Sequence, residues 1–127
     1  MFCFWNKRGI QDVEMGLTLM NRIDSHGASE ELIGKNGMAI LYFGNADCGV
    51  CRDMMPKVDK LLAEYPNIEG AYIDASASPE LSAMYSVFTL PAILVFAEGK
   101  EVIREARHMS FLDLGERIER YYNLLFG

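Results

Sequence analysis

Two cysteines stand close together in the sequence DCGVC at residues 47–51, and the segments on either side of them differ sharply in pattern. The preceding residues 38–43, MAILYF, carry no charge and are rich in residues that strands favour, which is typical of a strand buried on both faces. After Cys51 the apolar residues recur at helical spacing until Pro66: Met54, Met55, Val58, Leu61, Leu62 and Tyr65. The cysteine pair is therefore predicted at the N-terminus of a helix that follows a central strand.

The predicted position of the pair suits thiol chemistry. A thiolate attacks disulfides, and a helix N-terminus favours the thiolate because its free N–H groups and its macrodipole attract negative charge. Cys48 has that position, so we expect it to be the nucleophile. Cys51 follows one turn later on roughly the same face, where it can attack a mixed disulfide at Cys48 and release the product. Gly49 and Val50, between the cysteines, are expected to form part of the surface that meets the substrate.

Asp47 precedes the first cysteine and is expected to influence its pKa. The repulsion between a carboxylate and a thiolate at this spacing is of the same order as the ~0.3–1 kcal/mol that a helix terminus contributes. The pKa of Cys48 should therefore be lowered less than at a bare helix N-terminus, which favours a reductant over a strong oxidant. The alternative is that Asp47 is only the N-cap residue, with its carboxylate bonded to backbone N–H groups.

Two other interpretations of the cysteine pair stay open. Zinc sites usually take four Cys or His ligands, and only Cys3, His26 and His108 remain, singly and without a second paired motif. A zinc ion shared across a dimer, or an inert buried pair, would each remove the redox reaction. We expect no metal and no organic cofactor, and we place the two histidines in solvated loops or turns without a role.

Composition narrows the classes of function. The 127 residues are 50% hydrophobic and 24% charged, the balance of an ordinary globular domain. The net charge of −6 leaves no basic stripe to replace counterions, so we expect no nucleic-acid partner and no membrane partner. The apolar runs are far shorter than the ~20 residues that cross a bilayer, and residues 1–9, MFCFWNKRG, do not have the pattern of a signal peptide. We therefore expect a cytoplasmic protein, and we take a monomer as its working form.

Three further strands are predicted after the helix that follows the cysteines, at residues 68–74, 92–97 and 101–105. The last two are separated by EGK at residues 98–100, a short glycine-containing link that suits an antiparallel hairpin. The sheet should therefore be mixed.

Three further helices are predicted. Residues 29–37 should form a short capped helix that begins at Ser29, and Ser78 and Pro79 should begin another that ends near residue 87. A terminal helix should follow Ser110, which is placed with Asp113 as in a capping box. Its apolar face should cover the sheet with Phe111, Leu114, Ile118, Tyr121 or Tyr122, and Leu125.

The N-terminal part of the chain is less patterned. Residues 17–23 fit both helical and strand spacing, and we predict a strand there. No linker rich in Gly, Ser or Pro divides the chain. We therefore predict one domain at residues 17–127 with an N-terminal extension at residues 1–16, in which Cys3 is expected to be a free thiol without function.

This order of elements resembles the thioredoxin family. The resemblance covers about residues 17–127 and is carried by three motifs in register: CGVC at residues 48–51, Pro56 inside the following helix, and TLP at residues 89–91. It implies an α/β thioredoxin fold, in which helices flank a central mixed sheet. It also implies a cis peptide bond between Leu90 and Pro91, which would set backbone groups of Leu90 beside Cys48 to pair with an extended substrate segment.

The chain departs from the family at positions that matter for the reaction. Tyr42 occupies the position of the family's buried aspartate, which assists proton transfer from the second cysteine, and Gly70 that of its lysine partner. Gly44 and Asp47 replace the tryptophans that usually flank the motif, and the sole tryptophan, Trp5, lies outside the matched region. The usual proton relay is therefore expected to be absent, with water or Asp47 as its substitute.

The function that the resemblance implies is thiol–disulfide exchange. The protein would act as a disulfide reductase on protein disulfides, with electrons from a thioredoxin reductase or a small thiol. The alternative is a thioredoxin-fold module without catalytic activity that binds a partner protein through the site surface.

Overall fold

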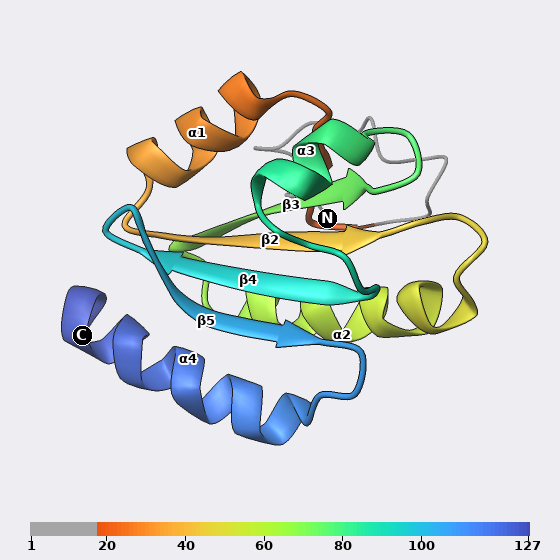
Figure 1. Cartoon of the computed structure of the whole chain (residues 1–127). Helices are drawn as coiled ribbons and strands as arrows, with labels where there is room; N and C mark the ends of the chain where they lie inside the picture. Colours follow the sequence, from red (N-terminus) through yellow and green to blue (C-terminus); the bar gives the residue numbers. More distant parts are fainter. Residues whose placement is uncertain (1–17) are drawn as a thin grey trace.

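The computed structural model describes residues 18–127, and Figure 1 shows how their strands and helices are arranged. The strands are β1 (Asn21–Arg22), β2 (Met38–Gly44), β3 (Ile68–Asp74), β4 (Ala92–Ala97) and β5 (Lys100–Ala106). The helices are α1 (His26–Lys35), α2 (Gly49–Glu64), α3 (Pro79–Met84) and α4 (Phe111–Phe126). No helix in this part of the chain is long and apolar enough to cross a membrane.

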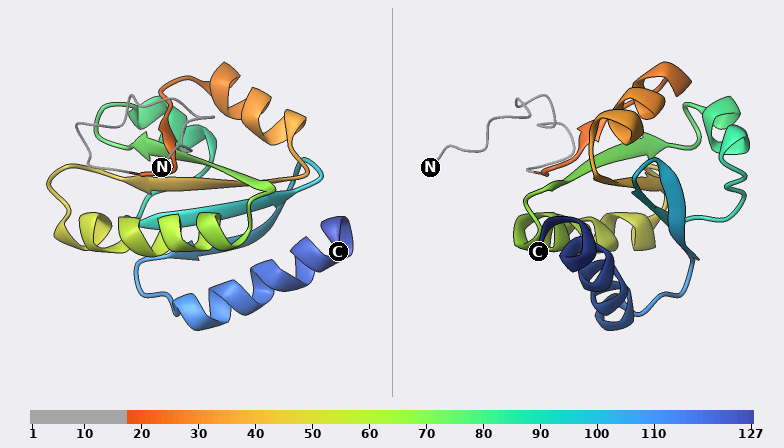
Figure 2. Two further views of the ribbon diagram at one scale, coloured as in Figure 1. Left: turned by 180° about the vertical axis from the view of Figure 1, so that it is seen from behind. Right: turned by 90° about the vertical axis from the view of Figure 1, so that its left-hand side faces the viewer.

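The strands form one mixed sheet in the order β1-β3-β2-β4-β5. The strands β1, β3 and β2 run parallel, whereas β4 pairs antiparallel with both β2 and β5. Helices α1 and α3 cover one face of the sheet, and α2 and α4 cover the other (Figures 1 and 2). The predicted α/β fold, with its mixed sheet and its hairpin, is confirmed.

The central strand β2 sends its side chains alternately into two cores. Ile40 and Tyr42 pack in the cluster that contains residues of α2 and α4, whereas Leu41 and Phe43 pack in the cluster that contains residues of α1 and α3. Every residue of β2 is buried. A strand covered on both faces has no polar face, which explains why residues 38–43 form a continuous apolar run.

Most of the other predicted elements are also present. The strands β3, β4 and β5 cover the predicted segments. Helix α4 follows Ser110, whose Oγ accepts a hydrogen bond from the backbone N–H of Asp113 at 3.1 Å. Its predicted apolar face packs on the sheet, with Leu114 and Ile118 buried in the core.

The start of α1 differs from the prediction. The helix begins at His26 rather than at Ser29, and its N-cap is Ser25, whose Oγ accepts a hydrogen bond from the N–H of Ala28 at 3.1 Å. Ser29 is buried inside the helix, where its Oγ lies 2.6 Å from the hydroxyl of Tyr85. Both serines are good N-cap residues, and the tertiary contact with Tyr85 decides which of them lies inside the helix.

Helix α3 is shorter than predicted. It ends at Met84 rather than near residue 87, because the chain turns at Ser86 with a left-handed φ of 57°. The N–H of Val87 then donates to the carbonyl oxygen of Ser82 at 2.8 Å. Ser78 has the predicted N-cap position, but its side chain makes no capping hydrogen bond.

The first strand is also shorter than predicted. Of the described residues 18–23, only Asn21–Arg22 form a strand, at the edge of the sheet beside β3. Two residues before it bond to the carboxylate of Asp59 on α2 instead, Thr18 through Oγ1 at 2.7 Å and Leu19 through its N–H at 2.9 Å.

The remaining predictions concern the N-terminal extension and the two histidines. The extension predicted at residues 1–16, with Cys3 and Trp5, lies outside the described residues. His108 lies exposed in a bend, as predicted. The prediction for His26 is wrong, because this residue opens α1 and its Nε2 lies 3.7 Å from the carboxylate of Glu30, one turn later.

Candidate active site

The cysteine pair lies where the loop after β2 meets the first turn of α2. Cys48 is the N-cap residue of α2 and has an extended backbone, with φ −96° and ψ 104°. Asn45 holds the loop in place: its Oδ1 accepts from the N–H of Asp47 at 3.0 Å, and its carbonyl oxygen accepts from the N–H of Cys48 at 3.3 Å. The loop is therefore a tight turn that places the first cysteine at the start of the helix.

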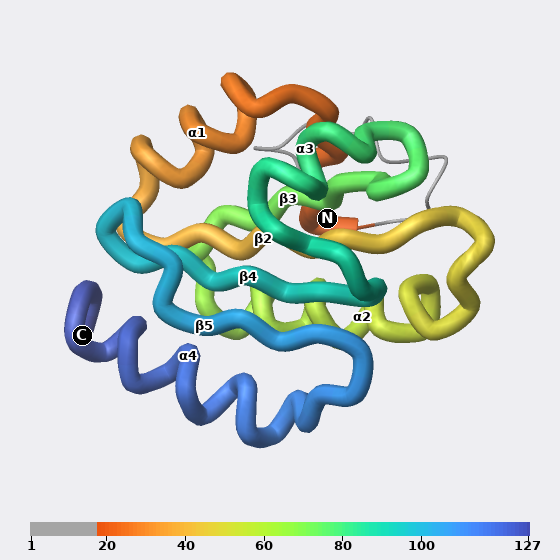
Figure 3. The backbone as a smooth tube through the Cα atoms, viewed as in Figure 1, coloured from red at the N-terminus to blue at the C-terminus, as the bar shows by residue number. Residues whose placement is uncertain are grey.

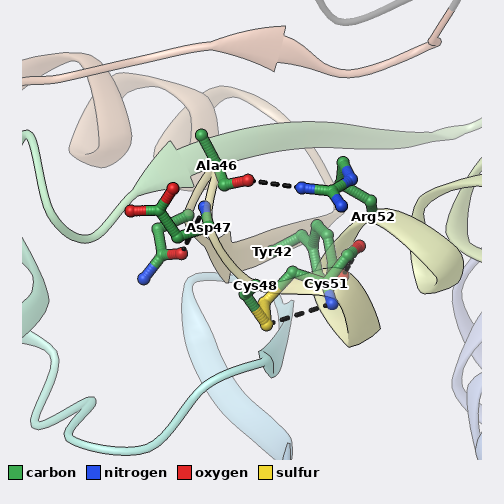
Figure 4. Close-up of a disulfide and its surroundings, with 7 residues drawn as sticks. Tyr42, Ala46, Asp47, Cys48, Cys51 and Arg52 are labelled. Atoms are coloured by element: carbon green, nitrogen blue, oxygen red, sulfur yellow. Dashed lines mark hydrogen bonds between the residues drawn. A yellow bond between two sulfur atoms is a disulfide. The ribbon is translucent and has the colours of Figure 1, made fainter.

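Arg52, the residue after the second cysteine, ties this loop to α2. Its guanidinium donates a hydrogen bond to the carbonyl oxygen of Ala46, and Figure 4 shows the side chain reaching across to that oxygen. Sequence reasoning missed Arg52, because a basic residue at an exposed helix position is usually solvated and gives no signal of its own.

Cys48 and Cys51 form a disulfide, with their Cα atoms 5.2 Å apart. The sulfur of Cys48 also accepts a hydrogen bond from the backbone N–H of Cys51 at 3.1 Å, so this sulfur itself caps the helix (Figure 4). The two residues differ in access, because Cys48 is half-buried whereas Cys51 is only 2% exposed. The arrangement offers one sulfur to a partner and shields the other.

Asp47 is exposed and is not the N-cap of α2. The alternative in which its carboxylate caps the helix is therefore wrong, because the cap position belongs to Cys48. Figure 4 shows the carboxylate of Asp47 turned away from the two sulfur atoms. An exposed charge is screened by water, so its influence on the cysteine is expected to be small.

Tyr42 is fully buried on β2, and its hydroxyl donates a hydrogen bond to the carbonyl oxygen of Cys51 (Figure 4). Burial, and to a smaller extent the neighbouring Tyr72, raise the pKa of Tyr42 above its usual value. Burial likewise raises the pKa of Tyr72, to which the carboxylate of Asp74 adds. The position that holds a carboxylate in the family thus holds a neutral hydrogen-bond donor in this chain.

Gly44 and Gly70 lie where side chains would not fit without movement. A Cβ atom at Gly44 would lie 3.0 Å from the Cβ of Cys51 and 3.2 Å from its sulfur. A Cβ atom at Gly70 would lie 2.6 Å from Cδ1 of Leu62. The backbone of β2 therefore rests directly against the second cysteine.

A partly open cavity of about 280 Å³ adjoins the second cysteine but not the first. The residues that line it come from the sheet edge, the cysteine loop and the first turns of α2: Arg22, Asn45, Ala46, Cys51, Arg52, Met55, Tyr72 and Asp74. Its open side gives solvent access to this neighbourhood.

Leu90 and Pro91 lie immediately before β4, and the peptide bond between them is cis. Ala92 pairs with Phe43 of β2, so Pro91 lies at the end of the sheet from which the cysteine loop departs. Figure 3 shows this connection close to the start of α2. The carbonyl oxygen of Pro91 accepts a hydrogen bond from the N–H of Arg107 at 2.8 Å.

Apolar side chains are exposed in the same two segments. Val50, between the cysteines, is 56% exposed, and Phe88, just before Leu90, is 81% exposed. Gly49 is exposed too, and no atom lies within 4 Å of the place where its Cβ would be. The approach to Cys48 from this side is therefore open and partly apolar.

No group of three or more His, Cys, Asp or Glu residues suited to a metal ion occurs among residues 18–127. His26 and His108 lie on α1 and after β5, respectively, and neither lines the cavity beside Cys51.

Sequence reasoning also missed Arg22, Tyr72 and Asp74, which share the cavity with Cys51. They come from β1 and β3, and only the pairing of these strands brings them to the cysteine loop. Asp74 ends its strand, and a polar residue at the end of a buried strand was the available signal.

The sequence profile of the thioredoxin family matches residues 23–117. The thioredoxin-like protein YdfQ of Bacillus subtilis is 32% identical over 108 residues, which cover 85% of this chain and 96% of that protein. A thioredoxin of Chlamydia trachomatis is 33% identical over 69 residues, 54% of this chain and 68% of that protein.

Solved structures agree with the sequence comparison. The X-ray structure of Fasciola hepatica thioredoxin superposes with a TM-score of 0.73 at 33% identity and covers 80% of this chain and 99% of its own. A mutant thioredoxin from Halobacterium salinarum superposes with a TM-score of 0.74 over 84% of this chain and 95% of its own, and at 23% identity it shows the fold alone.

Proposed function

The chain belongs to the thioredoxin family, and on that premise we propose that it is a protein-disulfide reductase with Cys48 as nucleophile and Cys51 as resolving thiol. Family membership and the paired cysteines support thiol–disulfide oxidoreductase activity in general. The observation that carries the specific roles is the difference in access between a half-buried Cys48 at the helix cap and a Cys51 that is 2% exposed.

The reaction consumes one dithiol for each substrate disulfide. The Cys48 thiolate attacks one substrate sulfur, so that a mixed disulfide forms and the other substrate sulfur leaves as a thiolate. Cys51 then loses its proton and attacks the sulfur of Cys48, which releases the second substrate thiolate and closes the protein disulfide. The substrate gains two electrons, and the leaving thiolates take up protons from water.

The substrate surface of this proposal combines four residues: Gly49, Val50, Leu90 and Pro91. The first two are exposed beside Cys48 and leave its approach open. The backbone of Leu90 would pair with an extended substrate segment, as an added strand does at a sheet edge.

The direction and the setting of the reaction belong to the same proposal. Electrons would come from a thioredoxin reductase or from a small thiol, and the protein would act as a cytoplasmic monomer. The paired cysteines in a chain with so few others support a reducing compartment.

A redox titration tests the class of function. The purified protein is equilibrated in thiol–disulfide buffers, quenched by alkylation, and analysed by peptide mass spectrometry at Cys48 and Cys51. Reversible interconversion with a potential between about −270 and −120 mV is expected, and a value near the lower end supports a reductant. A pair that remains reduced throughout removes the enzyme proposal.

Single substitutions test the separate roles of the cysteines. With a disulfide-bonded reporter protein, Cys51→Ser should accumulate a mixed disulfide through Cys48, because the resolving thiol is missing. Cys48→Ser should accumulate none, because Cys51 is shielded. Trapping by Cys48→Ser alone would reverse the assignment.

The second candidate function is a binding module without catalytic activity. The neutral Tyr42 in the place of the family's carboxylate favours it. In that case a partner recovered with the wild-type protein should remain bound after both cysteines are replaced by serine.

A further inference from the structure

The second half of the proposed reaction requires a proton route from Cys51. Its thiol must ionise before it attacks, yet Tyr42 offers a neutral phenol, which is a very weak base and already donates to the backbone of Cys51. Asp47 is turned away from the sulfurs and is exposed (Figure 4). A residue that is 2% exposed must therefore pass its proton to some other group.

The cavity beside Cys51 has the size that ordered water needs, and several polar groups lie in its otherwise largely apolar wall. Its volume of about 280 Å³ has room for several water molecules, each of which occupies ~30 Å³ in the liquid. Asn45, Arg52, Tyr72 and Asp74 supply donors and acceptors around it. Cys48 does not line this cavity, so it serves the second cysteine alone.

Asp74 is the carboxylate of this cavity, and the strand register brings it close to the reacting sulfur. It pairs with Gly44 across β3 and β2. The backbone of Gly44 in turn rests on the sulfur of Cys51, since a Cβ placed there would lie 3.2 Å from it. Gly44 thus lies between Asp74 and Cys51 and has no side chain to separate them, and the cavity adjoins both residues.

The two oxygens of the Asp74 carboxylate have different partners. Oδ1 accepts three hydrogen bonds from the following turn, two from Ser76 and one from the N–H of Ala77. Oδ2 lies 3.2 Å from the guanidinium of Arg22, another cavity residue. The turn fixes the carboxylate through one oxygen, and the second oxygen can accept a further hydrogen bond from water.

Three charged residues line the cavity beside Cys51: Arg22, Arg52 and Asp74. The titratable groups near Cys51 also include the neutral phenols of Tyr42 and Tyr72. Partial burial raises the pKa of Asp74, but the hydrogen bonds from Ser76 and Ala77 and the charge of Arg22 outweigh this effect and lower it below its usual value. The carboxylate is therefore ionised at the pH values at which thiols react.

We propose that the thiol proton of Cys51 leaves through water in this cavity toward Asp74, which acts as a positioning residue in place of the buried carboxylate of the family. The inference rests on the proposed function. In the mixed disulfide, the S–H bond of Cys51 breaks and its proton passes to a water molecule that Asp74 orients and whose positive charge Asp74 stabilises. The S–S bond between Cys48 and Cys51 forms as the substrate thiolate leaves, and the proton is lost to bulk solvent through the open side of the cavity.

The reaction with a chromogenic aryl disulfide separates the two steps. One equivalent of reagent added to the reduced protein should release coloured thiolate twice, first when Cys48 attacks and then when Cys51 closes the protein disulfide. The rate constant of the second release is followed against pH in the wild type and in Asp74→Asn. Asparagine keeps an oxygen for the turn at residues 75–77 but loses the negative charge.

Asp74→Asn is expected to slow the second release by roughly tenfold, which is below the ~10²–10⁴ of a fully positioned base because water can still accept the proton. In Asp74→Asn, the rate constant of the second release should also rise with hydroxide concentration over the whole pH range measured. The first release should stay unchanged. Ser76→Ala, which weakens the same turn and keeps the carboxylate, should leave both releases unchanged.

Met55→Trp tests whether the proton leaves through the cavity, because Met55 lines the cavity and a larger side chain there should fill part of it. A small buffer base such as formate should accelerate the second release in Asp74→Asn, since it can enter the cavity and accept the proton. Adding Met55→Trp to that variant should abolish the acceleration. Thermal unfolding of each variant confirms that it is folded before the rates are compared.

The outcomes separate this inference from the function on which it rests. A wild-type protein that gives the first release and no second one contradicts the resolving role of Cys51, and with it the proposed function. Two normal releases in both wild type and Asp74→Asn, with the same pH profile, overturn the role of Asp74 and leave the function intact.

Discussion

The hydroxyl of Tyr42 donates a hydrogen bond to the backbone carbonyl of Cys51, so the central strand holds the resolving cysteine through its main chain rather than through its thiol. Both residues are buried. A polar contact of this kind anchors the first turn of α2 on the sheet and leaves the sulfur free to change its bonding.

Tyr42→Phe should therefore lower stability more than it slows the reaction. Removal of the hydroxyl leaves the Cys51 carbonyl without this donor, which costs about 1–3 kcal/mol for a buried group. Urea unfolding of the wild type and the variant measures this loss. The rate at which Cys51 resolves a mixed disulfide should be unchanged, and a large fall in that rate would mean that the phenol takes part in proton transfer.

Alkaline pH should destabilise the protein through its buried phenols. The folded-state pKa values of Tyr42 and Tyr72 are raised above the usual value of 10.0. Their contribution to stability is therefore complete below about pH 10 and is lost as the pH rises above it, at up to ~1.4 kcal/mol per group and pH unit. Unfolding free energies measured from pH 8 upward should show this fall. Tyr42→Phe should reduce its slope, and an equal slope in both proteins would contradict the assignment.

Gly44→Ala should disturb the disulfide, whereas Gly49→Ala should not. A Cβ at Gly44 meets the Cβ of Cys51 at 3.0 Å, while a Cβ at Gly49 meets no atom within 4 Å. Overpacking of this kind costs about 1–3 kcal/mol. The loss should be larger in the oxidised protein, because a reduced Cys51 side chain can rotate away. Urea unfolding with and without reductant compares the two forms, and equal losses for both glycines would count against the contact.

Asp47→Asn should change the reactivity of Cys48 only slightly. The carboxylate is exposed and turned away from the sulfurs, and exposed charge pairs contribute ~0.2–1 kcal/mol, or less than about fivefold in rate. Alkylation rates of Cys48 between pH 5 and 9 measure the effect. An increase of tenfold or more would restore Asp47 as the residue that keeps this thiol weakly acidic.

The sequence predicted best those elements whose environment is simple. Residues 38–43 form a continuous apolar run because β2 is covered on both faces, and the spacing of the apolar residues in α4 follows from one buried face. The cis bond before Pro91 came from the family resemblance, since the dipeptide alone is compatible with either isomer.

The errors arose where a distant contact decided between local alternatives. Ser25 and Ser29 are both suitable caps for α1, and the hydrogen bond between Ser29 and Tyr85 places Ser29 inside the helix. At the cysteines, Asp47 was the alternative polar cap, but the sulfur of Cys48 accepts the helix N–H instead. The cavity beside Cys51 could not be predicted at all, because strand pairing alone brings β1 and β3 beside it.

The sulfur of Cys48 caps α2 by accepting the N–H of Cys51, so each change in the bonding of that sulfur also changes the first turn of the helix. A thiolate carries a full negative charge and is therefore a stronger acceptor than a disulfide sulfur. The amide proton of Cys51 therefore responds to the chemical state of its neighbour. Its exchange with deuterium should be slower in the reduced protein, where Cys48 is a thiolate, than in the disulfide form.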